Sequence, residues 1–577
     1  MDLEILRHSL SHIMASAVQE LYPTVKFGIG PAIEDGFYYD FDFGKNQSPI
    51  SNADLPKIEK KMIEIIQRKE KFQKEFIDLN SAKETFKNEP YKLDLIQELK
   101  TEKEKISIYR LGKFFDLCKG PHLESSSQVP VGCFKLTKVA GAYWRGSEKN
   151  PMLLRIYGIA MESKKSLDEY LSRLEEAKKR DHRILGEKLE LFLMDEEVGA
   201  GLPIWMPKGE TLIKIIERYL YEELKKAGYQ WLKSPHIASL QLWKTSGHWG
   251  FYRESMYSPI EVENEQYILK PMNCPFHIKV YNKKIRSYKD LPIRYAELGT
   301  VYRYEKSGVL HGLTRVRGFT QDDAHIYCMP EQLEKELLAT LKLAIKMLKD
   351  FGFKEYDIYL ATKPTEKYVG TDQIWEKATK ALKYALDALK LEYKMDEGGG
   401  AFYGPKIDIK IKDAIGRPWQ CTTIQADFNL PDRFKMEFIN EKGQRQEPIM
   451  IHRALLGAME RFVGILIENY AGAFPVWLSP IQASVIPIGT KHKKYAKAIF
   501  DKLQEADIRA ELKDHDDTIG KKIREAEMQK IPFMIVIGDK EMKSKKISVR
   551  DRKTQKTTSL SLNGFIKKVN ELIAKKR

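Results

Sequence analysis

The stretch Ile293-Arg-Tyr-Ala-Glu-Leu-Gly-Thr-Val-Tyr-Arg303-Tyr-Glu305 decides how the middle of this 577-residue chain folds. Read at the period of two that a β-strand imposes, Glu297, Arg303 and Glu305 fall on one face. A solvated charged face would give the same pattern. However, the neighbouring strands are apolar, and an arginine on a central sheet more often binds a phosphate or a carboxylate. The stretch therefore predicts a strand with an anion-binding face.

Two polar clusters lie farther along the same region. Phe319-Thr-Gln-Asp-Asp-Ala-His325 is bracketed by apolar residues, and alone it could be a turn with a capping aspartate. Ile449-Met-Ile-His452-Arg-Ala-Leu-Leu-Gly457-Ala-Met-Glu460-Arg461 reads as an apolar strand that runs into a helix. Core packing explains its apolar positions but not His452 or Arg461. The sequence has no Walker loop and no Gly-x-Gly-x-x-Gly after a strand, so a bound nucleotide would need another fold.

A third group lies near the start of the chain. His8-Ser-Leu-Ser-His12 places two imidazoles one helical turn apart, and Cys118-Lys-Gly-Pro-His122 adds a thiol and a third imidazole. These four side chains are a plausible zinc set, or three ligands and a catalytic group. Either pair alone is most simply interpreted as ordinary surface or core residues. Together, with Asp116 beside the thiol, they indicate a functional site.

The chain divides into four regions by pattern. Residues 1–165 mix short helices with glycine- and aromatic-rich strands, and residues 166–185 read as a solvated, charged linker helix. Residues 186–475 alternate helices with period-two strands, without the order of a dinucleotide fold. Residues 476–577 follow a strand–helix–strand–helix–strand pattern, which predicts a small α/β module with a mostly parallel sheet.

Composition excludes several classes of protein. Apolar residues make up 42% and charged residues 31%, so disorder and coiled coil are excluded for most of the chain. The net charge is +16, of which +11 lies in the last 102 residues, and such a surplus indicates a polyanion, either nucleic acid or an acidic membrane surface. Five cysteines form no disulfide framework, and neither a signal peptide nor a membrane-length apolar run is visible. We therefore expect a cytoplasmic protein that does not enter a membrane.

Several long motifs together resemble the threonyl-tRNA synthetase family of class II aminoacyl-tRNA synthetases. They are Lys270-Pro-Met-Asn-Cys274-Pro, Arg315-Val-Arg-Gly-Phe-Thr-Gln-Asp-Asp-Ala-His325 and Ala401-Phe-Tyr-Gly-Pro-Lys-Ile-Asp, and the resemblance runs from His8 to the C-terminus. It implies a multidomain α/β and α+β protein: an α+β editing domain, a catalytic core on an antiparallel sheet, and an α/β anticodon-binding domain. The long amphipathic helix at 209–227 resembles the element through which such enzymes form homodimers.

The resemblance also implies a reaction, in which ATP activates threonine and the product is transferred to tRNA(Thr). In that reaction Arg303 would hold the α-phosphate, Arg461 the γ-phosphate and Glu305 the adenine amine. Arg315 would also contact ATP, and Mg²⁺ would bridge the phosphates. Positioned positive charge is the main catalytic device for such chemistry. His248, in Ser-Gly-His-Trp, matches the candidate base for transfer to tRNA.

The family's catalytic zinc corresponds to Cys274, His325 and His452. Three protein ligands leave an open position, which the amino group and hydroxyl of threonine would occupy. Valine, which lacks the hydroxyl, would then be rejected strongly. By the same resemblance the amino-acid pocket comprises Met272, Gln321, Asp323, Tyr403, Thr423 and Gln425.

Serine keeps the amine and the hydroxyl, so zinc cannot exclude it. A missing methyl is worth only about 1–3 kcal/mol, and a second, hydrolytic site is therefore expected. The family's editing pocket for Ser-tRNA(Thr) corresponds to His8, His12, Tyr39, Lys92, Asp116, Cys118 and His122. Their chemistry would permit zinc, but the family hydrolyses with side chains and a water, so we expect no metal there.

Three features depart from the family pattern. A small ubiquitin-like domain commonly precedes the editing domain, whereas this sequence starts almost at the editing helix. Ala458 stands where serine is frequent. In the last region Arg524, Glu541 and Arg550 match anticodon-reading positions, but Lys530 replaces an arginine and Asp516 an asparagine. An ammonium cannot reproduce a bidentate guanidinium contact, so base recognition at Lys530 should differ.

Two other functions are weighed against this one. A related ligase for serine or proline is disfavoured by Cys274, His325 and His452, because a metal that ligates a hydroxyl does not suit proline. A non-enzymatic RNA-binding protein derived from a synthetase would be expected to have lost Arg303 or Arg461, and both are present.

Overall fold

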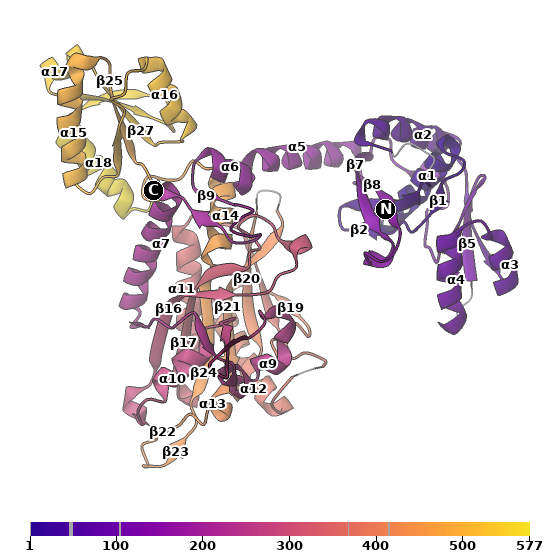
Figure 1. The fold of residues 1–577 in the computed structure, drawn as a ribbon, viewed down its shortest axis with the longest axis horizontal. Helices are drawn as coiled ribbons and strands as arrows, with labels where there is room; N and C mark the ends of the chain where they lie inside the picture. The colour runs from indigo at the N-terminus through magenta and orange to yellow at the C-terminus, as the bar shows by residue number, and fades with distance from the viewer. Residues whose placement is uncertain (1, 45–49, 103–105, 367, 414–415) are drawn as a thin grey trace. The chain divides into compact units, whose positions relative to one another are not determined.

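The computed structural model describes residues 2–44, 50–102, 106–366, 368–413 and 416–577. Contacts divide the chain into two units, Met1–Glu175 and Glu176–Arg577, and each is described by itself (Figure 1). Within the described ranges, no helix has both the length and the apolar composition that crossing a membrane requires.

The first unit is an α+β fold built on two sheets, with strand orders β1-β3-β8-β7 and β4-β5-β6, and β2 pairs with β3. Its helices are α1 (Leu3–Leu21), α2 (Leu55–Gln67), α3 (Leu79–Thr85), α4 (Pro90–Glu102) and α5 (Lys164–Arg180), the last of which continues into the second unit. Its strands are β1 (Lys26–Phe27), β2 (Ala32–Ile33), β3 (Gly36–Asp42), β4 (Phe72–Ile77), β5 (Ile106–Leu111), β6 (Phe114–Leu117), β7 (Phe134–Tyr143) and β8 (Met152–Ala160).

Helix α1 carries the first two histidines of the N-terminal cluster. It begins after Asp2, whose carboxylate accepts the Glu4 amide at 2.8 Å. Leu6, Leu10 and Ile13 are buried in the core that α1 shares with β3. This apolar face fixes the rotation of α1 and so fixes the direction in which its polar residues point.

The second unit contains an eight-stranded sheet of order β11-β16-β17-β24-β21-β20-β18-β19. All its pairs are antiparallel except β11 with β16 and β18 with β19. The strands are β11 (Gln230–Trp231), β16 (Ile293–Tyr302), β17 (Gly318–Cys328), β18 (Tyr356–Ala361), β19 (Lys394–Asp396), β20 (Lys406–Lys412), β21 (Pro418–Asp427) and β24 (Ile449–Ala458).

Helices cover one face of this sheet. They include α7 (Pro207–Lys226), α11 (Leu333–Asp350), α12 (Asp372–Ala388) and α14 (Met459–Tyr470), which share one apolar core with the strands (Figure 1). Smaller elements border the sheet: α6 (His182–Lys188), α8 (Leu240–Ser246), α9 (His248–Phe251), α10 (Cys274–Tyr281), α13 (Asn429–Arg433), β9 (Phe192–Leu193), β10 (Ile204–Trp205), β12 (Ile237–Ser239), β13 (Ile260–Val262), β14 (Glu265–Leu269), β15 (Arg286–Ser287), β22 (Phe438–Ile439) and β23 (Arg445–Gln446).

Strand β17 shows how the sheet separates its core from its polar face. Ala324 and Ile326 belong to the core beneath the helices. Gln321, Asp323 and His325 alternate with them and line a cavity on the opposite face. The stretch 293–305 departs from expectation at its end, because β16 stops at Tyr302. Arg303 and Glu305 therefore lie in the turn after the strand rather than on it with Glu297.

The last part of the chain forms the expected small α/β module, with strand order β26-β25-β27-β28-β29. Strands β25 (Ala483–Pro487), β26 (Ala510–Leu512) and β27 (Phe533–Ile537) pair in parallel, and β28 (Ile547–Asp551) and β29 (Thr557–Leu560) extend the sheet in the antiparallel sense. Its helices are α15 (Lys493–Glu505), α16 (Ile519–Met528), α17 (Asp539–Ser544) and α18 (Leu562–Ala574).

Candidate active site

A cavity of about 390 Å³ lies over the polar face of the eight-stranded sheet. It receives residues from β17, β21, β24 and the start of α14. The residues lining it include all those expected to bind ATP, threonine and zinc: Met272, Cys274, Arg303, Glu305, Arg315, Gln321, Asp323, His325, Tyr403, Thr423, Gln425, His452 and Arg461. The structure thus brings together residues separated by up to 189 positions in the chain.

Cys274, His325 and His452 converge on one wall of this cavity. Cys274 is the first residue of α10, and His325 and His452 face each other in the register of β17 and β24. One ligand atom from each lies within 4.8 Å of the other two, and all three side chains are buried. A thiol and two imidazoles at this spacing fit a tetrahedral zinc ion with one position left open.

In each of the two histidines, one ring nitrogen has a hydrogen-bond partner in the protein. The other nitrogen is left with a lone pair for a metal. His452 Nε2 lies 2.8 Å from the Asp427 carboxylate, so its Nδ1 is free to bind a metal. His325 Nδ1 lies 2.9 Å from His277 Nδ1, and His277 Nε2 lies 3.1 Å from Glu297. Such carboxylate–histidine pairs fix the tautomer and orientation of metal ligands.

Glu297 anchors this chain of hydrogen bonds. Burial opposes its ionisation, but hydrogen bonds from His277 and Ser234, with the charge of Lys270, lower the pKa of Glu297 to about 2. The ionised carboxylate requires His277 Nε2 to donate, so His277 Nδ1 accepts the proton of His325 Nδ1. His325 is therefore left with an unprotonated Nε2, which a metal ligand needs.

The amino-acid side of the cavity is held by buried hydrogen bonds. Asp323 accepts from the Asn273 amide at 3.0 Å, and burial raises the pKa of Asp323. Gln425 donates to the Gly404 carbonyl at 2.9 Å. The Thr423 hydroxyl donates to Asp408 at 2.8 Å. The walls are thus set before any ligand enters, and Tyr403 closes the pocket with its ring centroid 5.1 Å from that of His452.

Three arginines also line the cavity. Arg461 Nε donates to the Thr314 carbonyl at 2.9 Å, and Nη1 donates to the Gln420 carbonyl at 3.1 Å. Arg303 stacks on Phe319, with its guanidinium carbon 5.2 Å from the ring centroid. Arg315 pairs with Glu305 at 3.1 Å. Main-chain carbonyls and an aromatic ring therefore hold Arg461 and Arg303 in place, and these guanidinium groups suit a polyphosphate.

His248 is placed differently from the other expected residues, because it is buried and does not line the cavity. Its Nδ1 lies 2.7 Å from Ser246 Oγ, and its Nε2 lies 3.8 Å from Cys274 Sγ. Burial lowers the pKa of His248 to about 3, so the imidazole is neutral near pH 7 and able to accept a proton.

Asp322 is a residue whose importance the sequence did not reveal. Its carboxylate accepts the amides of Leu455, Leu456 and Gly457 at 2.8–3.0 Å, where β24 bulges against β17. Gly457 adopts φ +76° there, and a Cβ would lie 2.5 Å from the Cys421 carbonyl oxygen. The bulge leads directly into α14 and so places Arg461. The sequence also did not indicate the roles of Asp427 and His277. The only signal for Asp322 was that it stands beside a second aspartate, Asp323.

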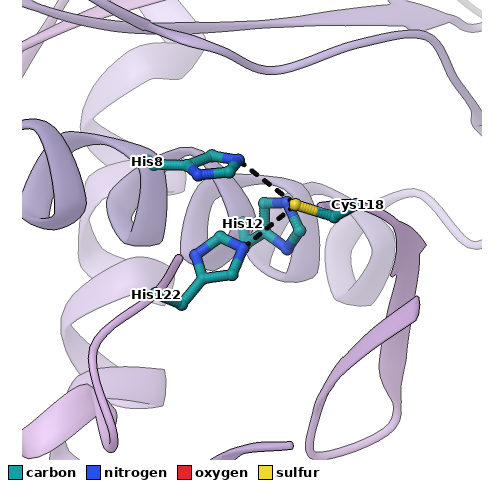
Figure 2. A group of neighbouring side chains, drawn as sticks. All are labelled: His8, His12, Cys118 and His122. Atoms are coloured by element: carbon teal, nitrogen blue, oxygen red, sulfur yellow. Dashed lines mark hydrogen bonds between the residues drawn. The ribbon is translucent and has the colours of Figure 1, made fainter. Parts of the chain in front are cut away.

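A second polar cluster lies in the first unit, and Figure 2 shows its three histidines around one thiol. His8 and His12 come from α1, whereas Cys118 and His122 follow β6. Cys118 Sγ lies 3.3 Å from the Nε2 atoms of both His8 and His122. Burial lowers the pKa of all three histidines and raises that of Cys118 to about 12. The cluster is therefore uncharged near pH 7.

The tautomers of two histidines follow from their other partners. His8 Nδ1 lies 3.2 Å from the Pro121 carbonyl, so it must donate. His122 Nδ1 lies 3.3 Å from Ser9 Oγ, which already donates to a carbonyl one turn earlier and can only accept here. Both Nε2 atoms are therefore acceptors that face the single proton of Cys118, and one of them remains able to accept a proton from water.

Three further residues expected at this site form a buried network beside it. Asp116 accepts the Tyr39 hydroxyl and pairs with Lys92, and Lys92 Nζ lies 3.1 Å from the Tyr39 hydroxyl. His12 Nε2 lies 3.6 Å from Asp116, which joins the network to the histidines. The structure thus gathers all seven residues of this set.

The residues expected to read the anticodon are dispersed over the small module. Asp516 is exposed and pairs with Lys493, and Arg524 is exposed on α16. Lys530 follows α16 in the left-handed region, at φ +55°. The two remaining residues have internal partners: Glu541 accepts from Gly538 N and Ser548 Oγ, and Arg550 donates to Glu527 and Gln555.

Three segments of the chain match models of known protein families. Residues 257–470 match the tRNA synthetase class II core domain (G, H, P, S and T), residues 482–572 the anticodon binding domain, and residues 106–157 the threonyl and alanyl tRNA synthetase second additional domain. The chain is 55% identical over 580 residues to a threonine–tRNA ligase of Sulfurihydrogenibium sp., covering 100% of this chain and 89% of that protein.

Two further comparisons agree. A threonine–tRNA ligase of Aquifex aeolicus is 51% identical over 579 residues, covering 100% of this chain and 90% of that protein. The crystal structure of the RNA binding domain of a threonyl-tRNA synthetase from Cryptosporidium parvum superposes with a TM-score of 0.66 at 41% identity, covering 68% of this chain and 98% of that one. The chain therefore belongs to the threonyl-tRNA synthetase family of class II aminoacyl-tRNA synthetases.

Proposed function

We propose that this chain activates threonine with ATP, transfers it to tRNA(Thr), and hydrolyses mischarged Ser-tRNA(Thr) at a separate site. The observation that carries the proposal is one cavity lined both by Cys274, His325 and His452 and by Arg303 and Arg461. An amino acid held by the first group would direct its carboxylate toward a phosphate held by the arginines.

The arginines carry the activation step. The threonine carboxylate attacks the α-phosphate of ATP, and pyrophosphate leaves. Arg303 stabilises the charge that develops on the α-phosphate, Arg461 holds the γ-phosphate, and Glu305 with Arg315 holds the adenine end. Because carbonyls fix Arg461 and stacking fixes Arg303, these two groups reorganise little during the reaction. Mg²⁺ bound with ATP supplies further neutralisation of the phosphates.

The proposed metal ligands select the amino acid. Cys274, His325 and His452 would hold a zinc ion, which would supply ligation for an amine and a hydroxyl. Asp323 and Gln425 orient the substrate, and Met272, Gln321, Tyr403 and Thr423 complete the pocket. Valine loses the hydroxyl contact outright and is rejected.

We assign His248 as the proton acceptor in the transfer to tRNA, because its imidazole is neutral near pH 7. For editing, we propose that the unprotonated Nε2 of His8 or His122 accepts a proton from the water that attacks the Ser-tRNA ester. Lys92, Asp116 and Tyr39 position the ester beside that water, and His12 and Cys118 complete the pocket.

The remaining assignments follow the family. We propose a homodimer formed through α7, an editing domain at 1–165, a linker helix at 166–185, a catalytic domain at 186–475 and an anticodon-binding domain at 476–577. The net charge of +11 in this last domain suits the phosphates of tRNA. Asp516, Arg524, Lys530, Glu541 and Arg550 are the proposed anticodon contacts, and the cytoplasm is the proposed location.

Two assays test the function. ATP–pyrophosphate exchange should be fastest with threonine, slower with serine and negligible with valine, and the same protein should deacylate Ser-tRNA(Thr) faster than Thr-tRNA(Thr). Fastest exchange with valine or proline would overturn the assignment of the substrate. Equal deacylation of the two charged tRNAs would overturn the editing assignment alone.

A further inference from the structure

His182 lies at the start of α6, and both of its ring nitrogens are engaged. Nδ1 lies 2.7 Å from Glu468 Oε1, and Nε2 accepts the Leu313 amide at 3.0 Å. Since the amide must donate to Nε2, Nδ1 carries the ring proton and donates it to Glu468. The side chain is completely buried. One imidazole therefore bridges helix α14 and the loop that follows β16.

The surrounding backbone leaves room for this ring. Gly312 adopts φ +48°, and a Cβ there would lie 2.2 Å from His182 Nε2. A Cβ on Gly464 would lie 3.5 Å from His182 Cδ2 and 3.2 Å from Leu313 Cβ. Gly312 thus leaves room for the imidazole, and any larger residue there would displace it, whereas Gly464 lets helix α14 approach Leu313 closely.

Helix α14 holds the loop at two points. Arg461 Nε donates to the Thr314 carbonyl at 2.9 Å, while Glu468 acts through His182 on the neighbouring Leu313 amide. Arg461, Gly464 and Glu468 are spaced i, i+3 and i+7, so they share one face of the helix. The peptide groups that precede Leu313 and follow Thr314 are therefore both fixed against one helix face, directly before Arg315.

We propose that His182 is a positioning residue for the nucleotide end of the cavity. It does not line the cavity, but it fixes the main chain of residues 311–315 against α14 and so sets the geometry of Arg315 and Arg461. The inference rests on the proposed function, in which these two arginines contact ATP. Without the imidazole, the buried Leu313 amide loses its acceptor and Glu468 loses its link to the loop, which favours other loop positions.

The test is the pair His182→Phe and His182→Gln in ATP–pyrophosphate exchange with the full chain. Phenylalanine keeps a ring but removes both hydrogen bonds, and we expect about a tenfold rise in the KM for ATP with less than a twofold change in the KM for threonine. Glutamine retains an acceptor for the Leu313 amide and should restore most of the ATP affinity. A merely structural role would move both KM values together.

A matched control exists in the small module. His492 is also buried, and its Nδ1 accepts the Gly489 amide at 3.0 Å, as His182 Nε2 accepts that of Leu313. His492→Phe should leave the KM for ATP unchanged in this assay, which needs no tRNA. Zinc content and Ser-tRNA deacylation report whether each variant is folded.

A folded His182→Phe variant with wild-type KM for ATP would overturn the inference. If that variant does not fold, Gly464→Ala decides, since alanine favours the helix but presses on Leu313, whose amide His182 holds. We expect it to raise the KM for ATP about threefold, and an unchanged value would overturn the inference. Failure of the proposed function is distinguishable, because the wild-type protein would then show no threonine-dependent exchange.

Discussion

The Nδ1 atoms of His277 and His325 lie 2.9 Å apart, so only one of them carries a proton. The ionised carboxylate of Glu297 decides which, because it requires a donor at His277 Nε2. The proton between the two rings therefore belongs to His325 Nδ1, and His325 Nε2 is left unprotonated. A residue that does not touch the proposed metal thus determines whether His325 can ligate it.

Replacing His277 by phenylalanine tests this relay. His325 would lose the acceptor that holds its ring, and we expect zinc affinity to fall about 10–100-fold, the usual effect of removing a partner of a metal ligand. Competition with a chromophoric chelator measures the affinity independently of activity. Zinc binding as tight as that of the wild-type protein would contradict the relay.

Cys274→Ala tests the ligand set itself. Removal of the thiol should abolish stoichiometric zinc binding and threonine-dependent exchange, because two imidazoles alone hold zinc weakly. Cys328→Ala is the matched control: this cysteine is equally buried, but it belongs to the apolar core beneath β17. Elemental analysis should find zinc in the control and not in Cys274→Ala, and the reverse pattern would exclude Cys274 as a ligand.

The editing cluster should have an unusual pH dependence. Burial lowers the pKa of His8 and of His122 below the ordinary 6.5, so both stay neutral as the pH falls through that value. Deacylation of Ser-tRNA(Thr) by a neutral imidazole should therefore keep its rate at pH 6.5 and decline only below it. The rate is measured from pH 8 to 5, with ATP–pyrophosphate exchange as the control for folding.

Two results would contradict this account of editing. A rate that halves near pH 6.5 would show that the essential imidazole is not shielded from protonation. Deacylation that survives in a variant with both His8→Ala and His12→Ala would place the reaction elsewhere. In that variant threonine activation should be unchanged, since both substitutions lie in the first unit.

Much of the fold could be predicted from local pattern. The apolar period at 209–227 predicted a long helix, and α7 occupies Pro207–Lys226. The last region was predicted as an α/β module, and its first three strands do pair in parallel. Alternation failed where it was extended too far: Arg303 and Glu305 lie beyond β16, because a strand's period says nothing about where its pairing ends.

The site could not be predicted from the spacing of its residues along the sequence. Cys274, His325 and His452 are spread over 178 positions, and only the pairing of β17 with β24 brings the two histidines opposite each other. Asp322 and Asp323 are neighbours with different tasks, since one supports the bulge in β24 and the other lines the cavity. Resemblance to a family supplied the ligand set, whereas the relay through His277 required the packed structure.

His248→Ala should separate the two steps of the synthetic reaction. Because His248 lies outside the cavity wall, exchange with threonine and ATP should stay within about twofold of wild type, whereas single-turnover transfer to tRNA should slow about 10²–10⁴-fold, the range for loss of a general base. Since burial lowers the pKa of His248 to about 3, the rate of wild-type transfer should not fall as the pH drops through 6.5.

His236→Ala, which removes a solvent-exposed histidine, is the control and should leave both steps intact. Equal slowing of exchange and transfer by His248→Ala would mean that His248 acts through its contact with Cys274 and not as the acceptor of a proton from tRNA.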